Sequence, residues 1–326
     1  MSPAPAACTH TDWGILRASG EDAVAFLHAQ LSSDVQALGP GEGQYWTYNS
    51  PKGRVLANGV LWRAPDERDD AIILLLASDL ATTIQKRLSM FVLRSKVTIE
   101  NATADSTLIG IAGEGAHDAT RAAFGVGPAR GRAVTFKAHA NAFTLPDGRV
   151  VVVAPIAEGG VLKAALARHA TIVGRNEWRR FGIALGVPLI TSATADLFVP
   201  QTANLDLLGG VSFTKGCYPG QEIVARMQYL GRLKERLFAF RSDAFDAAPG
   251  TRIYSKTFSV DQSCGVVVNV APDTAGGVAL LAVVQLDAVK ADDLTLGASD
   301  GPRLTRRPLP YDVPSASEDR TRPPVS

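Results

Sequence analysis

Short β-type runs joined by tight turns are the feature of this sequence that most constrains its fold. The turn Asn49-Ser50-Pro51-Lys52-Gly53 separates two such runs, 45–49 and 53–63, and Pro146-Asp147-Gly148 is a second turn of this kind. Connections this short join antiparallel strands, because a parallel pair needs a crossover of a dozen or more residues. The sequence therefore favours antiparallel sheets over a doubly wound parallel sheet.

Apolar residues at helical spacing predict helices between these runs. The predicted helices cover 22–38, 79–91, 116–124, 161–169 and 176–185. Strands and helices in this alternation indicate an α+β protein with two antiparallel-sheet lobes and packed helices. We expect one region, 8–232, to hold both lobes in interleaved form, with about 8–50 and 105–232 in one lobe and 51–104 in the other.

The texture of the sequence changes after residue 232. Short β-type runs separated by Pro, Gly and Asp turns follow, without a convincing helix. Such a pattern predicts a small C-terminal β-barrel over 233–300. The remaining segment, 301–326, has six prolines and few apolar residues, so we expect a Pro-rich tail.

Composition narrows the class of protein. The 326 residues include 33 Lys and Arg against 32 Asp and Glu, a formal net charge of +1. This balance argues against direct nucleic-acid binding by bulk electrostatics, although a local basic patch remains open. The longest apolar runs, such as Ala71–Ala77, are too short to span a membrane, and the start lacks a secretory pattern. We expect a cytoplasmic protein with no membrane contact and no metal motif.

The segment Phe213–Ile223 (FTKGCYPGQEI) is the most distinctive in the chain. Gly216, Pro219 and Gly220 fall within five positions and force a tight backbone. Pro219-Gly220 suits a type II turn, and a helix is predicted to start near Gln221. The segment therefore predicts a sharp loop that leads into a helix.

Cys217 is the candidate reactive group of this loop. It would lie just before the helix N-terminus and beside Lys215, and both positive charges favour the thiolate. The alternative is that Cys217 is a small buried apolar residue, as free cysteines often are. With Cys8 and Cys264 the chain has three cysteines, which are too few and too scattered for a disulfide framework, and no pair has the two-residue spacing of a zinc or redox motif.

The stretch Lys215–Glu222 (KGCYPGQE) resembles the signature of the folate-binding YgfZ family, which is related to the glycine-cleavage T-protein, an aminomethyltransferase. Further stretches resemble the family in the same order along the chain, and the likeness extends over about 10–300. They are Pro51–Arg54, Arg180–Pro188, Phe198–Leu205, Arg226–Arg236 and the strands near 264–268 and 279–284.

The resemblance implies a fold and a function. It implies a ring-like, three-lobed arrangement around an opening that binds tetrahydrofolate or a derivative. It also implies a role in assembling or maintaining iron–sulfur proteins, with effects on cluster-dependent tRNA-modifying enzymes. The partners would then be folate and iron–sulfur assembly or client proteins.

The resemblance also assigns roles to residues of the signature. Cys217 would be the reactive or cluster-facing thiol, and Lys215 would hold its thiolate or meet the carboxylates of folate. The positions expected to line the cofactor site are Gly216, Tyr218, Gly220, Gln221 and Glu222. Gln221 and Glu222 serve equally well to cap the helix or to bond the loop. Arg226 would attract the polyglutamate tail of folate or simply belong to a solvated helix face.

One departure from the T-protein concerns its catalytic aspartate. That residue follows the turn Lys52-Gly53-Arg54, where this chain has Ala57-Asn58 and no carboxylate. Asn58 would bond a pterin edge or a backbone partner. Gln201 and Asn204 occupy the region where a T-protein is expected to carry a pterin-binding glutamate.

Three functional readings remain after this comparison. The first is the folate-binding accessory protein, and the second is a tetrahydrofolate-dependent one-carbon (aminomethyl) transferase, which the missing carboxylate argues against. The third is a non-catalytic scaffold. Whether a reaction is catalysed is left open at this stage.

Overall fold

The structure is a computed structural model, and it describes residues 5–9, 11–65, 71–137, 139–229, 231, 233–259 and 262–314. The chain forms two compact units. Unit 1 comprises Met1–Trp46 and Ala57–Trp178, and unit 2 comprises Thr47–Leu56 and Arg179–Ser326. The tip of one β-hairpin, 47–56, therefore clusters with the C-terminal part of the chain.

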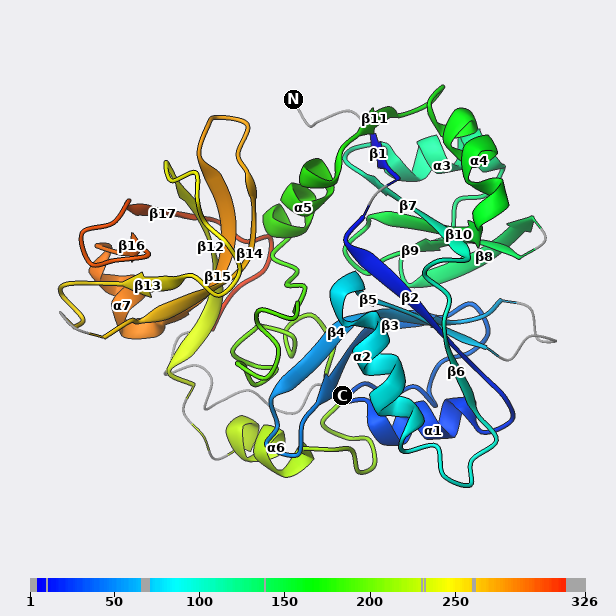
Figure 1. Ribbon diagram of the computed structural model, residues 1–326, viewed down its shortest axis with the longest axis horizontal. Coiled ribbons are helices and arrows are strands. Elements are labelled where there is room, and N and C mark those ends of the chain that lie inside the picture. The colour runs from blue at the N-terminus through cyan, green and yellow to red at the C-terminus, as the bar shows by residue number, and fades with distance from the viewer. Residues whose placement is uncertain are drawn as a thin grey trace. The chain divides into compact units, whose positions relative to one another are not determined.

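The first sheet of unit 1 is five-stranded, in the order β3-β4-β5-β2-β6 (Figure 1). Its strands are β2 (Trp13–Ser19), β3 (Gly43–Asn49), β4 (Val55–Arg63), β5 (Ile72–Ala77) and β6 (Thr98–Asn101). β2 pairs antiparallel with β5 and with β6, and β5 pairs antiparallel with β4. Helix α1 (Ala23–Gln30) follows β2, and α2 (Ser78–Ser89) packs on β2 and β6.

The second sheet of unit 1 is six-stranded, in the order β11-β1-β7-β10-β9-β8. Its strands are β1 (Ala6–Cys8), β7 (Ser106–Ala112), β8 (Arg132–Lys137), β9 (Ala140–Thr144), β10 (Val150–Pro155) and β11 (Thr171–Val173). The pairs are antiparallel except β1 with β11, which is parallel. Helix α3 (Ala116–Phe124) contacts α4 (Gly159–Leu166), and the 3₁₀ turn η1 (Ile156–Glu158) leads into α4.

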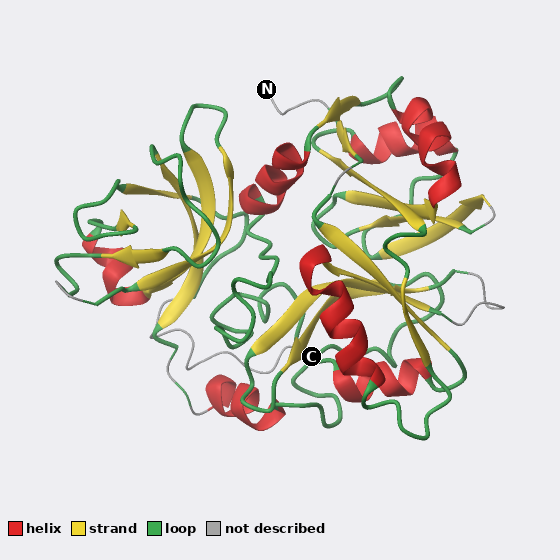
Figure 2. Cartoon of the chain, in the orientation of Figure 1, coloured by secondary structure: helices red, strands yellow, loops and turns green. Residues whose placement is uncertain are grey.

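Unit 2 contains a six-stranded sheet in the order β16-β13-β14-β15-β12-β17. Its strands are β12 (Glu235–Ser242), β13 (Arg252–Tyr254), β14 (Gly265–Pro272), β15 (Val278–Gln285), β16 (Thr295–Leu296) and β17 (Leu304–Arg307). Three helices complete the described set: α5 (Arg175–Ala184), α6 (Gln221–Tyr229) and α7 (Leu286–Ala291), shown in red in Figure 2. Within the described ranges, none of the helices has the length and apolar character needed to cross a membrane.

The expected α+β class with antiparallel sheets is confirmed by these three sheets. The helix expected over 22–38 is wrong in its second half, because α1 ends at Gln30 and Leu31 turns to an extended backbone. Ser32 and Ser33 follow and are buried. Serine side chains compete for backbone hydrogen bonds and so favour helix ends over helix interiors.

The expectation of no helix after residue 232 is also wrong. α7 follows β15 directly and buries Leu286 and Ala288. A helix of six residues is too short to show a clear apolar period. In addition, β17 lies in the segment expected to be a tail and pairs with β12, with Ala239 opposite Arg307. The expected lobe boundaries stay a prediction.

A buried ion pair organises the core of unit 1. The Arg149 guanidinium bonds the Asp147 carboxylate at 2.6 Å, and the Tyr45 hydroxyl donates to the same carboxylate at 2.7 Å. The guanidinium also lies 4.7 Å from the ring centre of Trp178 and 5.7 Å from that of Trp13. Burial by itself would raise the pKa of the Asp147 carboxyl. The Arg149 guanidinium outweighs burial, and the pKa is lowered. Each charge therefore depends on its partner.

We predict that Arg149→Leu destabilises the protein by about 3–5 kcal/mol, because it leaves the Asp147 carboxylate buried without its cation. Urea unfolding followed by circular dichroism measures this change. Arg175→Leu is the matched control, because Arg175 is about half exposed and lies 3.6 Å from Asp12. Its loss should cost under about 1 kcal/mol. Equal losses for the two variants would contradict the prediction.

Candidate functional site

Two glycines bring the hairpin tip of unit 2 against the start of α6. Gly53 has φ +69° and Gly220 has φ +78°, both in the left-handed region. A Cβ on Gly220 would lie 2.4 Å from the Ser50 carbonyl oxygen and 2.7 Å from the Gly53 Cα, and one on Gly53 would lie 2.8 Å from the Ile223 Cβ. Only glycine fits at both positions. The backbone of the Pro51–Arg54 turn therefore packs directly against the Lys215–Glu222 loop and the start of α6, and we call this contact the interlock.

The hairpin tip is also tied to the segment before the loop. Val55 donates its N–H to the Phe198 carbonyl at 2.8 Å, and the Asp196 N–H donates to the Val55 carbonyl at 2.8 Å. The Ser50 hydroxyl donates to the Asp196 carboxylate at 2.9 Å, and Arg54 donates to the Leu197 carbonyl. Three stretches that resemble the YgfZ family thus converge in one unit.

The expected turn and helix are confirmed. The Gln221 N–H donates to the Tyr218 carbonyl at 3.2 Å, and with Gly220 at positive φ this is the type II turn expected at Pro219-Gly220. α6 then starts at Gln221 and buries Val224. Phe213, just before the loop, meets Tyr229 at the end of α6 edge to face, with ring centres 6.3 Å apart, a contact that the sequence analysis did not predict.

The two candidate catalytic residues point in different directions. Cys217 is exposed. Lys215 is buried at 8% exposure, and its ammonium lies 5.1 Å from the ring centre of Tyr218. Burial also raises the pKa of the Tyr218 hydroxyl. The lysine stem and the tyrosine ring therefore form the inner side of the loop, and the thiol lies on its outer side. Gly216, between them, is exposed.

The other cysteines have the opposite environment. Cys8 and Cys264 are each 1% exposed, in β1 and immediately before β14. Burial raises the pKa of the Cys264 thiol to about 11. A buried thiol with so high a pKa is a poor nucleophile and metal ligand. Cys217 is therefore the cysteine that solvent and a partner can reach, and the alternative of a buried apolar role for it is excluded.

The polar residues at the start of α6 make local contacts. The Gln221 amide reaches back 3.5 Å to the Lys215 carbonyl, which favours loop bonding among its expected roles. Glu222 accepts a hydrogen bond from Arg226 at 2.8 Å, one helical turn later, and both side chains are largely exposed. Such a pair adds little stability, so Glu222 and Arg226 remain available to solvent.

Gln201 is fully buried and connects α6 to the sheet of unit 2. Its amide nitrogen donates to the Val224 carbonyl at 2.8 Å, and its backbone carbonyl accepts from Arg236 at 2.7 Å. Its side-chain oxygen, Oε1, has no hydrogen-bond partner among the described residues. The amide nitrogen of Asn49, at the hairpin, is buried and lacks a partner in the same sense. Sequence reasoning missed Asn49, whose signal was a polar residue at the end of a buried strand.

Asn204 makes a different set of contacts. Its backbone has φ +57°. Its side-chain amide bonds the backbone of Leu237 as a neighbouring strand would: it donates to the Leu237 carbonyl at 2.9 Å and accepts from the Leu237 N–H at 3.4 Å. Its amide also lies 3.5 Å from the Tyr311 hydroxyl. The amide is thus used within the fold, and its expected role in cofactor binding stays a prediction.

Asn58 lies in unit 1, on β4, and is 1% exposed. Ala57 before it is also buried, and neither residue carries a carboxyl group. Across the described ranges, no three His, Cys, Asp or Glu side chains gather as a group that could hold a metal ion.

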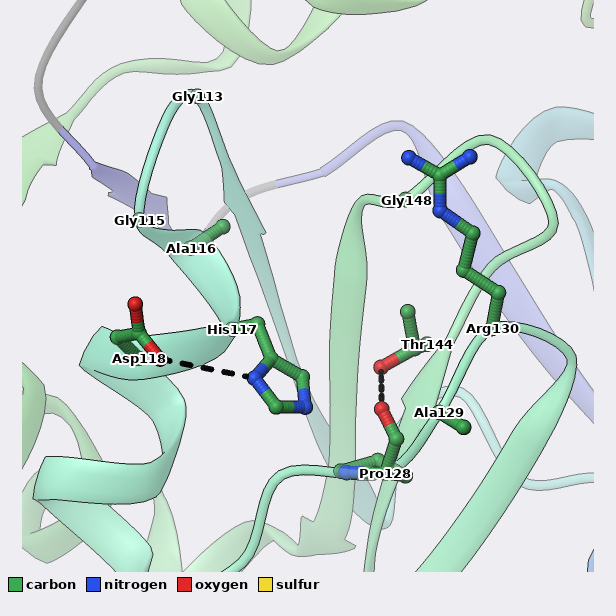
Figure 3. A pocket seen from close by; sticks show the side chains of 10 residues that line it. All are labelled: Gly113, Gly115, Ala116, His117, Asp118, Pro128, Ala129, Arg130, Thr144 and Gly148. Atoms are coloured by element: carbon green, nitrogen blue, oxygen red, sulfur yellow. Dashed lines mark hydrogen bonds and ion pairs between the residues drawn. The ribbon is translucent and has the colours of Figure 1, made fainter.

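A separate pocket of about 310 Å³ lies in unit 1 at the start of α3 (Figure 3). One wall is formed by the Gly113–Gly115 turn and His117, whose ring faces Asp118 at 3.8 Å. Arg130 and Gly148 line the other wall, where Thr144 bonds the Pro128 carbonyl at 2.7 Å. None of the candidate residues named above lines this pocket.

The fold places the chain in a known structural class. A solved structure of the glycine cleavage system aminomethyltransferase T from Bartonella henselae superimposes with a TM-score of 0.75, covering 93% of this chain and 84% of that one. Sequence identity is 14%, so this likeness concerns the fold alone. The chain has an aminomethyltransferase T-like fold.

Curated relatives give a narrower result. Two proteins named tRNA-modifying protein YgfZ are each 29% identical to this chain. The one from Enterobacter sp. (strain 638) aligns over 93% of this chain and 92% of its own length, and the one from Yersinia pestis (strain Pestoides F) over 95% and 92%. No family model matches the chain. The resemblance to the YgfZ family is confirmed over nearly the whole sequence.

We predict that Gly220→Ala destabilises unit 2 by about 3 kcal/mol, from left-handed strain plus the clash with the Ser50 carbonyl. Gly209→Ala is the matched control: Gly209 has φ +77°, but its added Cβ would meet nothing within 4 Å. We expect that variant to lose only about 1–2 kcal/mol. Chemical denaturation of both measures the difference, and equal losses would show that the interlock contributes nothing.

Proposed function

We propose that this protein is a cytoplasmic, tetrahydrofolate-binding accessory protein that supports the assembly or maintenance of iron–sulfur proteins. Cluster-dependent tRNA-modifying enzymes would be among those affected. The observation that carries the proposal is the exposed Cys217, held on a loop that two glycines lock against the hairpin tip. The relatives named tRNA-modifying proteins and the aminomethyltransferase T-like fold support it.

The residues of unit 2 fit a pterin in one respect. The buried Gln201 Oε1 can accept a hydrogen bond and the buried Asn49 Nδ2 can donate one, and neither has a partner among the residues described. Buried polar atoms of this kind are costly unless a ligand or water satisfies them. A pterin edge carries both donors and acceptors. When bound, tetrahydrofolate would supply a carrier of one-carbon units.

We infer the roles of the signature residues from their positions. Lys215 lies against Tyr218 and shapes the loop from inside, so we assign it as a positioning residue for Cys217. Gln221 bonds the same loop at the Lys215 carbonyl. Arg226 is 61% exposed and the Glu222 carboxylate that it pairs with is exposed too, so Arg226 can attract the anionic tail of folate.

Cys217 alone cannot hold a four-cysteine cluster. Cys8 and Cys264 are buried, so no second thiol of this chain can assist it. The remaining ligands of any cluster would come from the client protein, and contact with the cluster would be shared or transient. The absence of a carboxylate at Ala57-Asn58 argues against aminomethyl transfer by the T-protein route.

We predict that the protein binds tetrahydrofolate and that Gln201→Met raises the dissociation constant at least about tenfold, because the variant removes a polar partner of the pterin. Anaerobic calorimetry measures both values. Thr202→Val is the matched control, because it removes a buried hydroxyl that donates to the Val199 carbonyl in the same segment. If both variants weaken binding equally at equal thermal stability, Gln201 acts only on the fold.

We predict that Cys217→Ala abolishes complementation of a deletion strain, measured by the activity of cluster-dependent enzymes, and leaves tetrahydrofolate affinity within about twofold. The thiol is exposed, so its loss should not unfold the chain. Thr214→Ala, at another exposed position of the loop, should retain full complementation. Full activity of the Cys217 variant would refute the role of the thiol.

A further inference from the structure

The segment 86–96 (KRLSMFVLRSK), which comprises the last turn of α2 and most of the connection to β6 in Figure 1, exposes an unusual group of apolar side chains. Met90 is 74% exposed, Phe91 47% and Leu93 88%. Single exposed apolar residues are ordinary, but three within four positions form a patch of the kind that marks an interaction site. We call this segment the basic–apolar turn.

The turn is held in one shape by its own backbone. The Met90 N–H donates to the Lys86 carbonyl at 3.2 Å, Phe91 to Leu88 at 3.0 Å and Ser95 to Val92 at 2.8 Å. Leu88 is fully buried and anchors the turn in unit 1. The exposed side chains are therefore presented on a preformed surface, which lowers the ordering cost of binding.

Leu93 shows that this shape has a cost. Its backbone has φ +45°, a conformation that residues with a Cβ rarely adopt. The side chain is almost fully exposed, so burial within the chain does not offset the strain. Strain of this kind persists where the surrounding backbone fixes it, and it clusters at functional sites.

The turn carries positive charge without a balancing carboxylate of its own. Its eleven residues include four basic side chains and no acidic one. Both Lys86 and Arg94 are exposed, and within the described ranges neither forms an ion pair. Lys96 pairs with Glu21 at 2.8 Å, but both side chains are at least 70% exposed, so the pair is easily exchanged.

We propose that the basic–apolar turn is a docking surface for single-stranded segments of RNA. Phosphates would meet Lys86, Arg94 and Lys96, and an unstacked base would lie on the exposed Phe91 ring, the arrangement by which proteins bind RNA loops. The charge of the turn is what favours RNA, because four cations suit a phosphate backbone and two of them are lysines, which are depleted at protein–protein interfaces. The net charge of +1 means that the attraction is local to this turn.

The proposal goes beyond the proposed function and does not depend on folate. RNA binding can fail while tetrahydrofolate binding holds, and the reverse. The two are measured on the same full-length chain with different ligands, so their failures are distinguishable.

The experiment is fluorescence anisotropy with a labelled 12-nucleotide single-stranded RNA and with bulk tRNA. The logarithm of the association constant should fall against the logarithm of salt concentration with a slope of about −2 to −3, the value for three or four phosphate contacts on a single strand. Phe91→Ala should weaken binding at least about fivefold at unchanged slope. Arg94→Glu should weaken binding and make the slope shallower by about 0.7, the contribution of one phosphate contact on a single strand.

Two control variants change the same residue types elsewhere in unit 1. Ile156→Ala removes an exposed apolar side chain, and Lys163→Glu reverses an exposed charge, so both should bind RNA as the wild type does. The proposal is overturned if the wild type fails to bind either RNA at low salt, or if the controls weaken binding as much as the turn variants. Binding to phosphatidylglycerol vesicles without binding to RNA would overturn it as well.

Discussion

The close approach of Gly53 to Gly220 is the constraint on which the candidate site depends. Two positive-φ glycines face each other with no room for a Cβ on either, so the backbone of one turn forms the floor of the other. Any side chain at these positions would push the hairpin tip away from α6. The loop that ends in the turn at Pro219-Gly220 buries Lys215 and Tyr218 and leaves Gly216 and Cys217 exposed.

The segment 200–206 connects α6 to the C-terminal sheet by hydrogen bonds. Gln201 bonds α6 with its side chain and Arg236 of β12 with its backbone. Arg236 also pairs with Asp206 at 2.7 Å, with both groups buried. Buried ion pairs add little net stability, but removing one partner is costly, so they fix one arrangement strongly. Asn204 continues the same pattern toward Leu237. The loop, α6 and β12 are thus joined by hydrogen bonds as well as by apolar packing.

Sequence reasoning succeeded where a local rule decides the structure. The type II turn at Pro219-Gly220 and the stop of α3 at Gly125, with φ +75°, follow from backbone preferences of single residues. It failed where tertiary burial overrides periodicity. Leu31 and Val35 keep a helical spacing and are fully buried, yet the chain there is not helical. It also could not predict that Lys215 lies inside the loop, because the contact of its ammonium with the Tyr218 ring depends on the folded shape of the loop.

The net charge of the whole chain and the charge of one surface region describe different aspects of how a partner is attracted. A net charge of +1 describes the field far from the molecule, but salt screens that field beyond about 10 Å. Within that distance the local charges matter: the eleven residues of the basic–apolar turn carry four cations, and the Glu21 carboxylate that lies 2.8 Å from Lys96 comes from outside the turn. The same argument applies to the cysteines: two of the three are buried, and Cys217 is the exposed one to which the proposed function assigns a role. These two places expose residues that a partner could reach, and neither is visible in the composition.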